Sequence, residues 1–165
     1  MQLINLIFQH DVLFQAVKQE ASQLAARRSN ENGETLFDLL VFDEGYLSRF
    51  RELFFNARAE LGIILSPYQK DIPAATGFFE RKDFSKDRDY TVSIGVNDDF
   101  NMHLSRVIED YIYTFLKDHI MYKWLETKSP RDAETFLYSK ENYKQKIKNT
   151  LETGSKGIRR EHRYW

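Results

Sequence analysis

Cysteine is absent from the 165 residues of this chain, and glycine is scarce, with 7 residues. Without cysteine the chain cannot form a disulfide, a thiolate metal site or a cysteine nucleophile. No glycine lies in a Gly-rich run, and neither a GxxxxGK phosphate loop nor a GxSxG nucleophile elbow is present. An HExxH motif and a compact His/Asp cluster with metal-ligand spacing are also missing. We therefore expect no enzyme activity and no cofactor or metal.

Long apolar runs are missing as well. No stretch approaches the roughly 20 apolar residues that a membrane span requires. The start, MQLINLIFQHDV, lacks a basic leader, and its apolar run is too short for a signal peptide. These observations favour a chain made in a reducing cytoplasm, with no membrane partner.

Aromatic residues are abundant, at 15% of the chain, with 13 Phe, 9 Tyr and 2 Trp. Aromatic side chains contribute much of the energy of cores and of protein interfaces. A chain with this composition is expected to have more apolar surface than one small core can bury. We take this as an indication of self-assembly or of a large partner.

Hydrophobic periodicity predicts one mostly helical domain over residues 1–153, followed by a basic aromatic tail over 154–165. SNENGET at 29–35 is expected to be a loop, and the apolar run at 36–42 is ambiguous. The second half of the third helix is apolar on nearly all sides, which places it at the centre of the fold. The predicted helices cover 11–28, 43–62, 100–127 and 130–152.

One strand is predicted with a clear period of two, YTVSIGV at 90–96. A single strand cannot satisfy its own backbone groups, so it must pair with another segment. The candidates are residues 75–81 and a neighbouring subunit. For a contact between subunits, the candidate residues are Tyr90, Val92, Ile94 and Val96.

Charge is unevenly distributed along the chain. The whole chain has a net charge of −1, but residues 144–165 hold seven Lys or Arg against two Glu. The body is therefore acidic and the C-terminal end is basic, an asymmetry that often marks a partner contact.

The end of the chain, GIRREHRYW, allows three interpretations. It can be a frayed, solvated terminus. It can bind nucleic acid, with arginines on phosphates and an aromatic ring stacked on a base. It can dock on another protein, because Arg and Trp are favoured interface anchors. The candidate partner-binding residues are Ile158, Arg159, Arg160, Arg163, Tyr164 and Trp165.

Two weaker candidates for chemistry lie in the third predicted helix. Asp118 and His119 could contribute to an active site completed by another helix, although a helix-face or partly buried role is the more ordinary interpretation. The aromatic residues of the same helix are more typical of a core than of a cofactor pocket. These are Tyr111, Phe115, Tyr122 and Trp124.

The C-terminal half, residues 88–165, resembles a family of small structural proteins. The resemblance rests on the order of an alternating strand (YTVSIGVNDDFN), a long apolar helix (IEDYIYTFLKDHIMYKWL), a KSPRDAETF restart and a basic end (IRREHRYW). This order is similar to that of head–tail connector or tail-completion proteins in the neck of tailed bacteriophages, in particular phages of Bacteroidetes and crAss-like phages. The basic end here lacks the proline associated with that family, and residues 1–87 match no family.

The resemblance implies a structural role in the virion, without catalysis or cofactor. Connectors of this kind form a ring, often of about twelve copies, beneath the portal protein and contact other neck or tail proteins. DNA passes through the ring without specific binding. Excess aromatics, an unpaired strand and an extended tail agree with such a role. The alternative is a small nucleic-acid-binding or regulatory protein that uses its basic tail.

Overall fold

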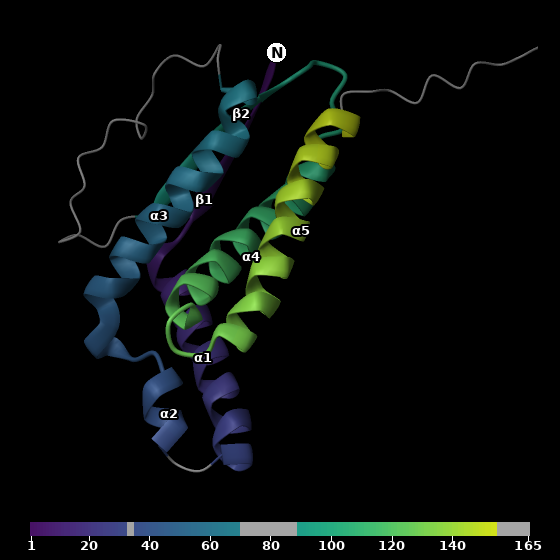
Figure 1. Cartoon of the computed structure of the whole chain (residues 1–165). Helices are drawn as coiled ribbons and strands as arrows, with labels where there is room; N and C mark the ends of the chain where they lie inside the picture. The colour runs from purple at the N-terminus through teal and green to yellow at the C-terminus, as the bar shows by residue number, and fades with distance from the viewer. Residues whose placement is uncertain (33–34, 70–88, 155–165) are drawn as a thin grey trace, which may run out of the picture.

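The computed structural model describes residues 1–32, 35–69 and 89–154. They form a mainly α-helical bundle with a small two-stranded sheet, which confirms the predicted fold class (Figure 1). The predicted tail lies almost entirely outside the described residues. In chain order the elements are β1 (Gln2–Phe8), α1 (His10–Asn32), α2 (Thr35–Leu40), the 3-10 turn η1 (Glu44–Tyr46), α3 (Leu47–Leu65), the 3-10 turn η2 (Ser66–Tyr68), β2 (Tyr90–Val96), α4 (Leu104–Leu125) and α5 (Pro130–Gly154).

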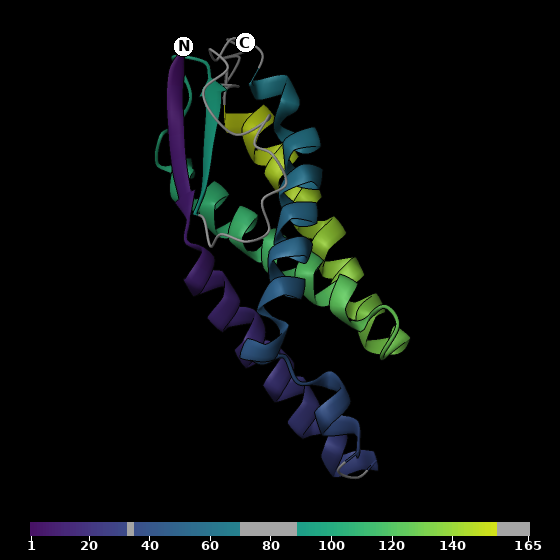
Figure 2. The same ribbon diagram turned by 90° about the vertical axis from the view of Figure 1, so that its left-hand side faces the viewer.

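The described part of the molecule is elongated (Figures 1 and 2). β1 leads directly into α1, and α1 and α2 extend past the connection between α4 and α5 at one end. The opposite end, called the upper end here, is where β1 begins and where α3, β2 and α5 end. The residue that leads into the C-terminal tail therefore lies beside the start of the chain.

Helix α4 occupies the centre of the bundle. It packs along α5 and also contacts α3, α1 and β1. Its second half is buried on several sides, as the sequence predicts, because apolar residues there face more than one neighbour. Side chains of α4 with no exposed surface are Ile108, Ile112, Phe115, Leu116, Ile120, Met121 and Leu125.

Aromatic rings fill the junction of α1, α3 and α4. The ring of Phe42 lies 4.5 Å from that of Trp124, and the ring of Phe14 lies 5.1 Å from that of Phe50, both edge to face. Nε1 of Trp124 donates a hydrogen bond of 3.0 Å to the carbonyl of Leu40, which fastens the end of α2 to α4. Part of the aromatic excess is thus used within the chain's own core.

The sheet pairs the two strands antiparallel from Gln2↔Val96 to Phe8↔Tyr90, without a bulge. One face of the sheet is buried against the helices, and the other is open. The buried face consists of Ile4, Leu6 and Phe8 of β1 and Val92, Ile94 and Val96 of β2. On the open face, Leu3 is 46% and Ile7 is 60% exposed.

The structure corrects several predicted boundaries. Strand β2 has the predicted bounds, but its partner is β1 of the same chain, which the sequence analysis did not assign. The expected loop at 29–35 is mostly helix, since α1 continues to Asn32 and α2 begins at Thr35. No glycine or proline interrupts the chain before Gly33, and polar residues alone do not end a helix.

Candidate functional site between three helices

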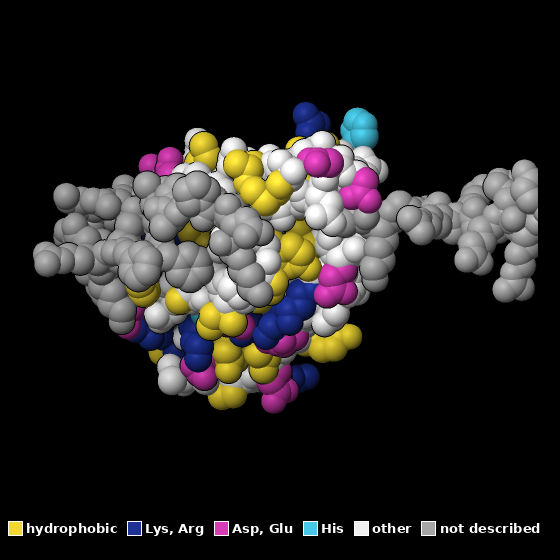
Figure 3. All heavy atoms as spheres, turned by 90° about the horizontal axis from the view of Figure 1, so that it is seen from above, with side chains coloured by type: hydrophobic (Ala, Val, Ile, Leu, Met, Phe, Trp, Pro, Cys, Tyr) yellow, Lys and Arg dark blue, Asp and Glu magenta, His cyan; other side chains and the backbone are white. Residues whose placement is uncertain are grey.

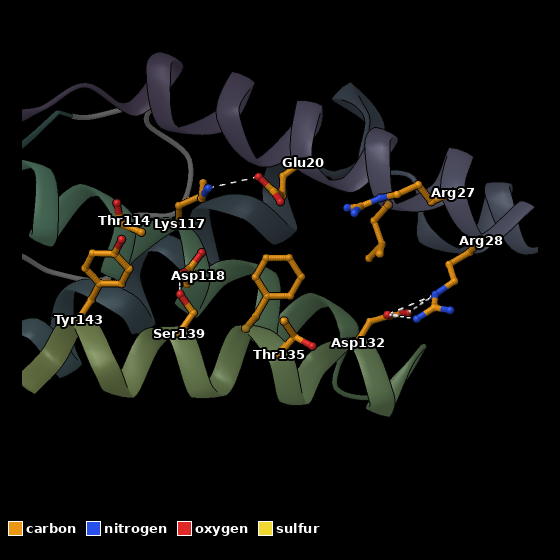
Figure 4. A pocket seen from close by; sticks show the side chains of 12 residues that line it. Glu20, Arg27, Arg28, Thr114, Lys117, Asp118, Asp132, Thr135, Ser139 and Tyr143 are labelled. Carbon is orange, nitrogen blue, oxygen red and sulfur yellow. Dashed lines mark hydrogen bonds and ion pairs between the residues drawn. The ribbon is translucent and has the colours of Figure 1, made fainter.

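A groove of about 570 Å³ lies between α1, α4 and α5 (Figure 4). Helix α1 forms one wall and α5 the other, with α4 between them. The groove is lined by Glu20, Leu24, Arg27, Arg28, Thr114, Lys117, Asp118, Asp132, Thr135, Phe136, Ser139 and Tyr143.

Asp118 is the buried carboxylate of this groove, with an exposed fraction of 4%. The Ser139 hydroxyl of α5 donates a hydrogen bond of 2.6 Å to its Oδ2 atom. Burial raises the pKa of Asp118, while the Ser139 hydrogen bond and the nearby Lys117 ammonium act in the opposite direction. The pair joins α4 to α5 and places one carboxylate in the groove.

Ion pairs connect α1 to the other two walls. Lys117 Nζ lies 3.2 Å from Glu20 Oε2. The guanidinium of Arg28 holds Asp132 through Nη2 at 2.6 Å and through Nε at 3.2 Å from each carboxylate oxygen. Acidic and basic side chains are therefore interleaved along the groove, so it presents no field of one sign that would capture a phosphate or a polycation.

His119 does not join Asp118 in this groove. Neighbouring residues on a helix point about 100° apart, and His119 faces α3, where its Nδ1 lies 2.9 Å from Glu60 Oε2. Lys140 Nζ donates to both oxygens of the same carboxylate, at 3.2 and 3.1 Å. Asp118 and His119, which the sequence suggested as parts of one active site, thus contact different helices.

Glu60 is the centre of a largely buried polar network. The close contact with His119 is the largest influence on the pKa of Glu60; together with the Lys140 ammonium it outweighs burial and lowers this pKa from 4.5 to about 2. His119 and Lys140 are 3% and 5% exposed. The network links α3, α4 and α5, and none of its members lines the groove.

The other two histidines that the structure describes, His10 and His103, belong to no metal centre. His10 is buried, with its ring 5.0 Å from that of Phe50, and His103 is exposed in the turn before α4. Across the residues that the structure describes, no group of three His, Asp or Glu is arranged to hold a metal ion. In the same residues no helix has the length and apolar character of a membrane span.

The predicted partner contacts have different outcomes. Ile158, Arg159, Arg160, Arg163, Tyr164 and Trp165 all lie outside the described residues, so their role stays a prediction. The strand residues are described: Val92, Ile94 and Val96 are at most 4% exposed, and Tyr90 packs partly buried against the same core. Their side chains serve the core of their own chain and leave little surface for a second subunit.

The aromatic residues of α4 lie in or beside the core, as predicted. Phe115 is fully buried and Trp124 is 5% exposed, whereas Tyr111 and Tyr122 pack at the edge. The Tyr122 hydroxyl donates to Glu126 Oε1 at 3.2 Å. Edge positions let tyrosine keep its hydroxyl near polar groups.

In comparisons with known proteins, no family model, no curated protein and no solved structure matches this chain. Its function must therefore be argued from its own residues.

Proposed function

We propose that this chain is a structural protein of the neck of a tailed bacteriophage, a ring-forming connector that joins the portal to the tail. The observation that carries the proposal is that exposed apolar side chains from three separate segments lie at the upper end, where α5 ends and the C-terminal segment begins. Exposed apolar groups gathered at one place are typical of surfaces that bind another protein.

Three segments contribute these side chains. Met1 at the start of β1 is 60% exposed, Ile63 in the last turns of α3 is 75% exposed, and Met102 before α4 is 41% exposed. The space-filling view of this end shows apolar side chains with acidic and basic ones among them (Figure 3). A polar rim around apolar groups is the usual composition of a protein interface.

The charge distribution supports the same role. Helix α5 ends at the upper end, and the basic residues of the C-terminal segment follow it. An acidic body beside a DNA channel would let DNA pass, because like charges repel. A basic, aromatic segment at the apolar end suits docking on a neighbouring subunit or on the portal.

The groove between α1, α4 and α5 supports an enzyme less well. Asp118 bonds to a serine hydroxyl, while the nearest histidine in the sequence faces the opposite network. General acid–base catalysis requires groups that converge on one reacting atom. Asp118 and His119, the pair suggested by the sequence, do not converge in this groove.

The proposal predicts a portal gene near the gene of this chain, and its test is assembly of the two proteins. Both proteins are co-expressed, and the complex is purified and imaged by electron microscopy. We expect the chain to form a ring on the portal. Ile63→Glu should abolish this assembly, because it puts a charge in the apolar end. Tyr138→Glu is the matched control, since Tyr138 is 79% exposed on α5, away from that end.

Two results would contradict the proposal. One is a gene neighbourhood without portal, capsid or terminase genes. The other is a chain that binds DNA in a salt-dependent manner and loses this binding when Arg159, Arg160 and Arg163 become alanine. The second result would favour the nucleic-acid-binding alternative.

A further inference from the structure

The two strands of the sheet differ in how their outer edges are covered. Gln69 Nε2 donates a hydrogen bond of 3.0 Å to the carbonyl of Ser93, so this carbonyl points away from β1. The Tyr68 carbonyl also lies against the same strand, 3.1 Å from where a Cβ on Gly95 would be. The turn that follows α3 therefore covers the outer edge of β2 in part, at Ser93 and Gly95.

The outer edge of β1 has no backbone partner among the residues that the structure describes. Ser93 is opposite Asn5. In an antiparallel pair, two opposite residues either both direct their backbone groups toward the partner strand or both direct them away from it. The N–H and C=O groups of Asn5 thus point away from β2, as do those of Leu3 and Ile7 by the period of two. No described residue forms a backbone hydrogen bond with these three.

β1 also lacks the features that usually protect such an edge. Natural edge strands carry lysines, prolines or bulges that prevent pairing with another chain. The segment QLINLIF has no charged residue, no proline and no glycine, and its seven residues pair without a bulge. A long, flat and uncharged edge is a template for a further strand.

We propose that β1 pairs antiparallel with β1 of a second copy of this chain, about a two-fold axis at Asn5. In this register Asn5 faces Asn5, and Leu3 faces Ile7 of the second copy. About six backbone hydrogen bonds form, and the product is a continuous four-stranded sheet in the order β2–β1–β1–β2. This pairing concerns the free chain and does not depend on the neck role.

The sequence of β1 favours a second copy of this chain as the partner of its outer edge. On the open face, Asn5 has an apolar residue on either side, Leu3 and Ile7. The pattern of apolar, amide and apolar side chains is therefore the same in both chain directions, so two antiparallel copies of β1 match each other. Leu3 and Ile7, exposed by 46% and 60%, cover each other across the axis. A shift by two residues would place an apolar side chain opposite an amide. The contacts of Gln69 and Tyr68 at Ser93 and Gly95 obstruct head-to-tail pairing of β1 with β2 of the next copy.

Single cysteines test the register directly, because the natural chain has none. Strands in a sheet are about 4.8 Å apart. In the proposed dimer the two copies of residue 5 lie on adjacent strands, about 4.8 Å apart, whereas the two copies of residue 93 lie on the outermost strands, roughly 14 Å apart. Asn5→Cys should form a disulfide-linked dimer under mild oxidation, whereas Ser93→Cys, on the same face, should not. Equal cross-linking of the two variants, or none at Asn5→Cys, would overturn the proposal.

The mass of the free chain gives an independent test. Light scattering over about 1 to 300 μM should show a monomer that becomes a dimer. Asn5→Lys should raise the dissociation constant at least tenfold, because two lysines would meet on the axis. Thr91→Lys adds the same charge on the same face of β2 and should leave the constant within about twofold. Circular dichroism of both variants confirms that they remain folded.

Other occupants of the edge are distinguished by truncation. A chain without residues 155–165 should dimerise as the full chain does. Loss of the dimer in the truncated chain would identify the C-terminal segment as the occupant and overturn the two-fold pairing. A monomer at every concentration would overturn it as well, while leaving assembly on a portal to be judged by its own test.

Discussion

Nδ1 of His119 on α4 lies 2.9 Å from Oε2 of Glu60 on α3, inside the bundle. Lys140 on α5 donates to the same carboxylate, and its side chain is 7% exposed. One carboxylate thus holds three helices together and neutralises an ammonium group that water barely reaches. Stability should depend strongly on this carboxylate.

Replacing Glu60 by glutamine should reduce the free energy of unfolding by about 2–3 kcal/mol, because it removes the nearer carboxylate of the buried Lys140 ammonium and leaves that of Glu141, 3.6 Å away. Urea unfolding at neutral pH measures the change. Glu52→Gln is the control, since Glu52 and its partner Arg49 are each 47% exposed. An exposed pair of this kind contributes less than about 1 kcal/mol. A loss no larger for Glu60→Gln than for the control would contradict the proposed role.

Acid should weaken the fold through the same residue. The pKa of Glu60 is about 2 in the folded chain, below its ordinary value of 4.5. A carboxyl group with a lowered folded pKa stabilises the fold above its unfolded pKa. That contribution is lost as the pH falls from about 4.5 towards 2. We expect about 1–2 kcal/mol to disappear in this window, less than the full shift implies because the side chain is partly solvated. Urea unfolding at several acidic pH values should show a shallower decline for Glu60→Gln.

Arg27 and Arg28 are neighbours that both line the groove, but replacing them by alanine should change the melting temperature by different amounts. Arg28 is held by Asp132 in a two-pronged contact between α1 and α5, and its side chain is 23% exposed. Arg28→Ala should lower the melting temperature by about 2–8 °C, since about 1–2 kcal/mol is lost from a partly buried pair. Arg27 is exposed, so Arg27→Ala should change it by about 1 °C or less. Equal effects in a thermal scan would show that the ion pair does not join the helices.

Gly154 at the end of α5 lies against the ring of Phe100. A Cβ at this position would lie 2.9 Å from both Cδ2 and Cζ of that ring, inside van der Waals contact. Gly154→Ala should therefore cost about 1–3 kcal/mol, because the nearly buried ring must move. The comparison is Gly45→Ala, whose Cβ would meet only the Asp43 carboxylate, at 3.0 Å. Chemical unfolding should show a larger loss of unfolding free energy for Gly154→Ala than for Gly45→Ala.

The sequence predicts the strand at 90–96 to the residue, because every second side chain is apolar and the others are small or polar. It conceals β1, because Leu3 and Ile7 are apolar although they lie on the open face. The alternation of Ile4, Leu6 and Phe8 is then masked by apolar residues on both faces, with Asn5 as the polar exception. An edge strand that pairs with another chain is expected to have this ambiguity, since apolar side chains on its open face gain neighbours on the added strand.

The groove and the Glu60 network could not be predicted from spacing alone. Asp118 and His119 are adjacent in the chain, yet they contact α5 and α3 respectively. Their partners, Ser139 and Glu60, are 21 and 59 positions away, and only the packing of three helices brings them close. The periodicity of α4 predicts that it is central, but not which neighbour each polar residue meets.

The long separation between β1 and β2 has a consequence for synthesis. Phe8 pairs with Tyr90, so β1 leaves the ribosome more than eighty residues before its partner exists. At ordinary translation rates this delay lasts on the order of ten seconds. During this delay, several nascent chains on one messenger RNA expose the same uncharged, apolar segment close to one another. Chaperone capture of the growing chain, or encounter of two such segments on one polysome, therefore precedes closure of the sheet.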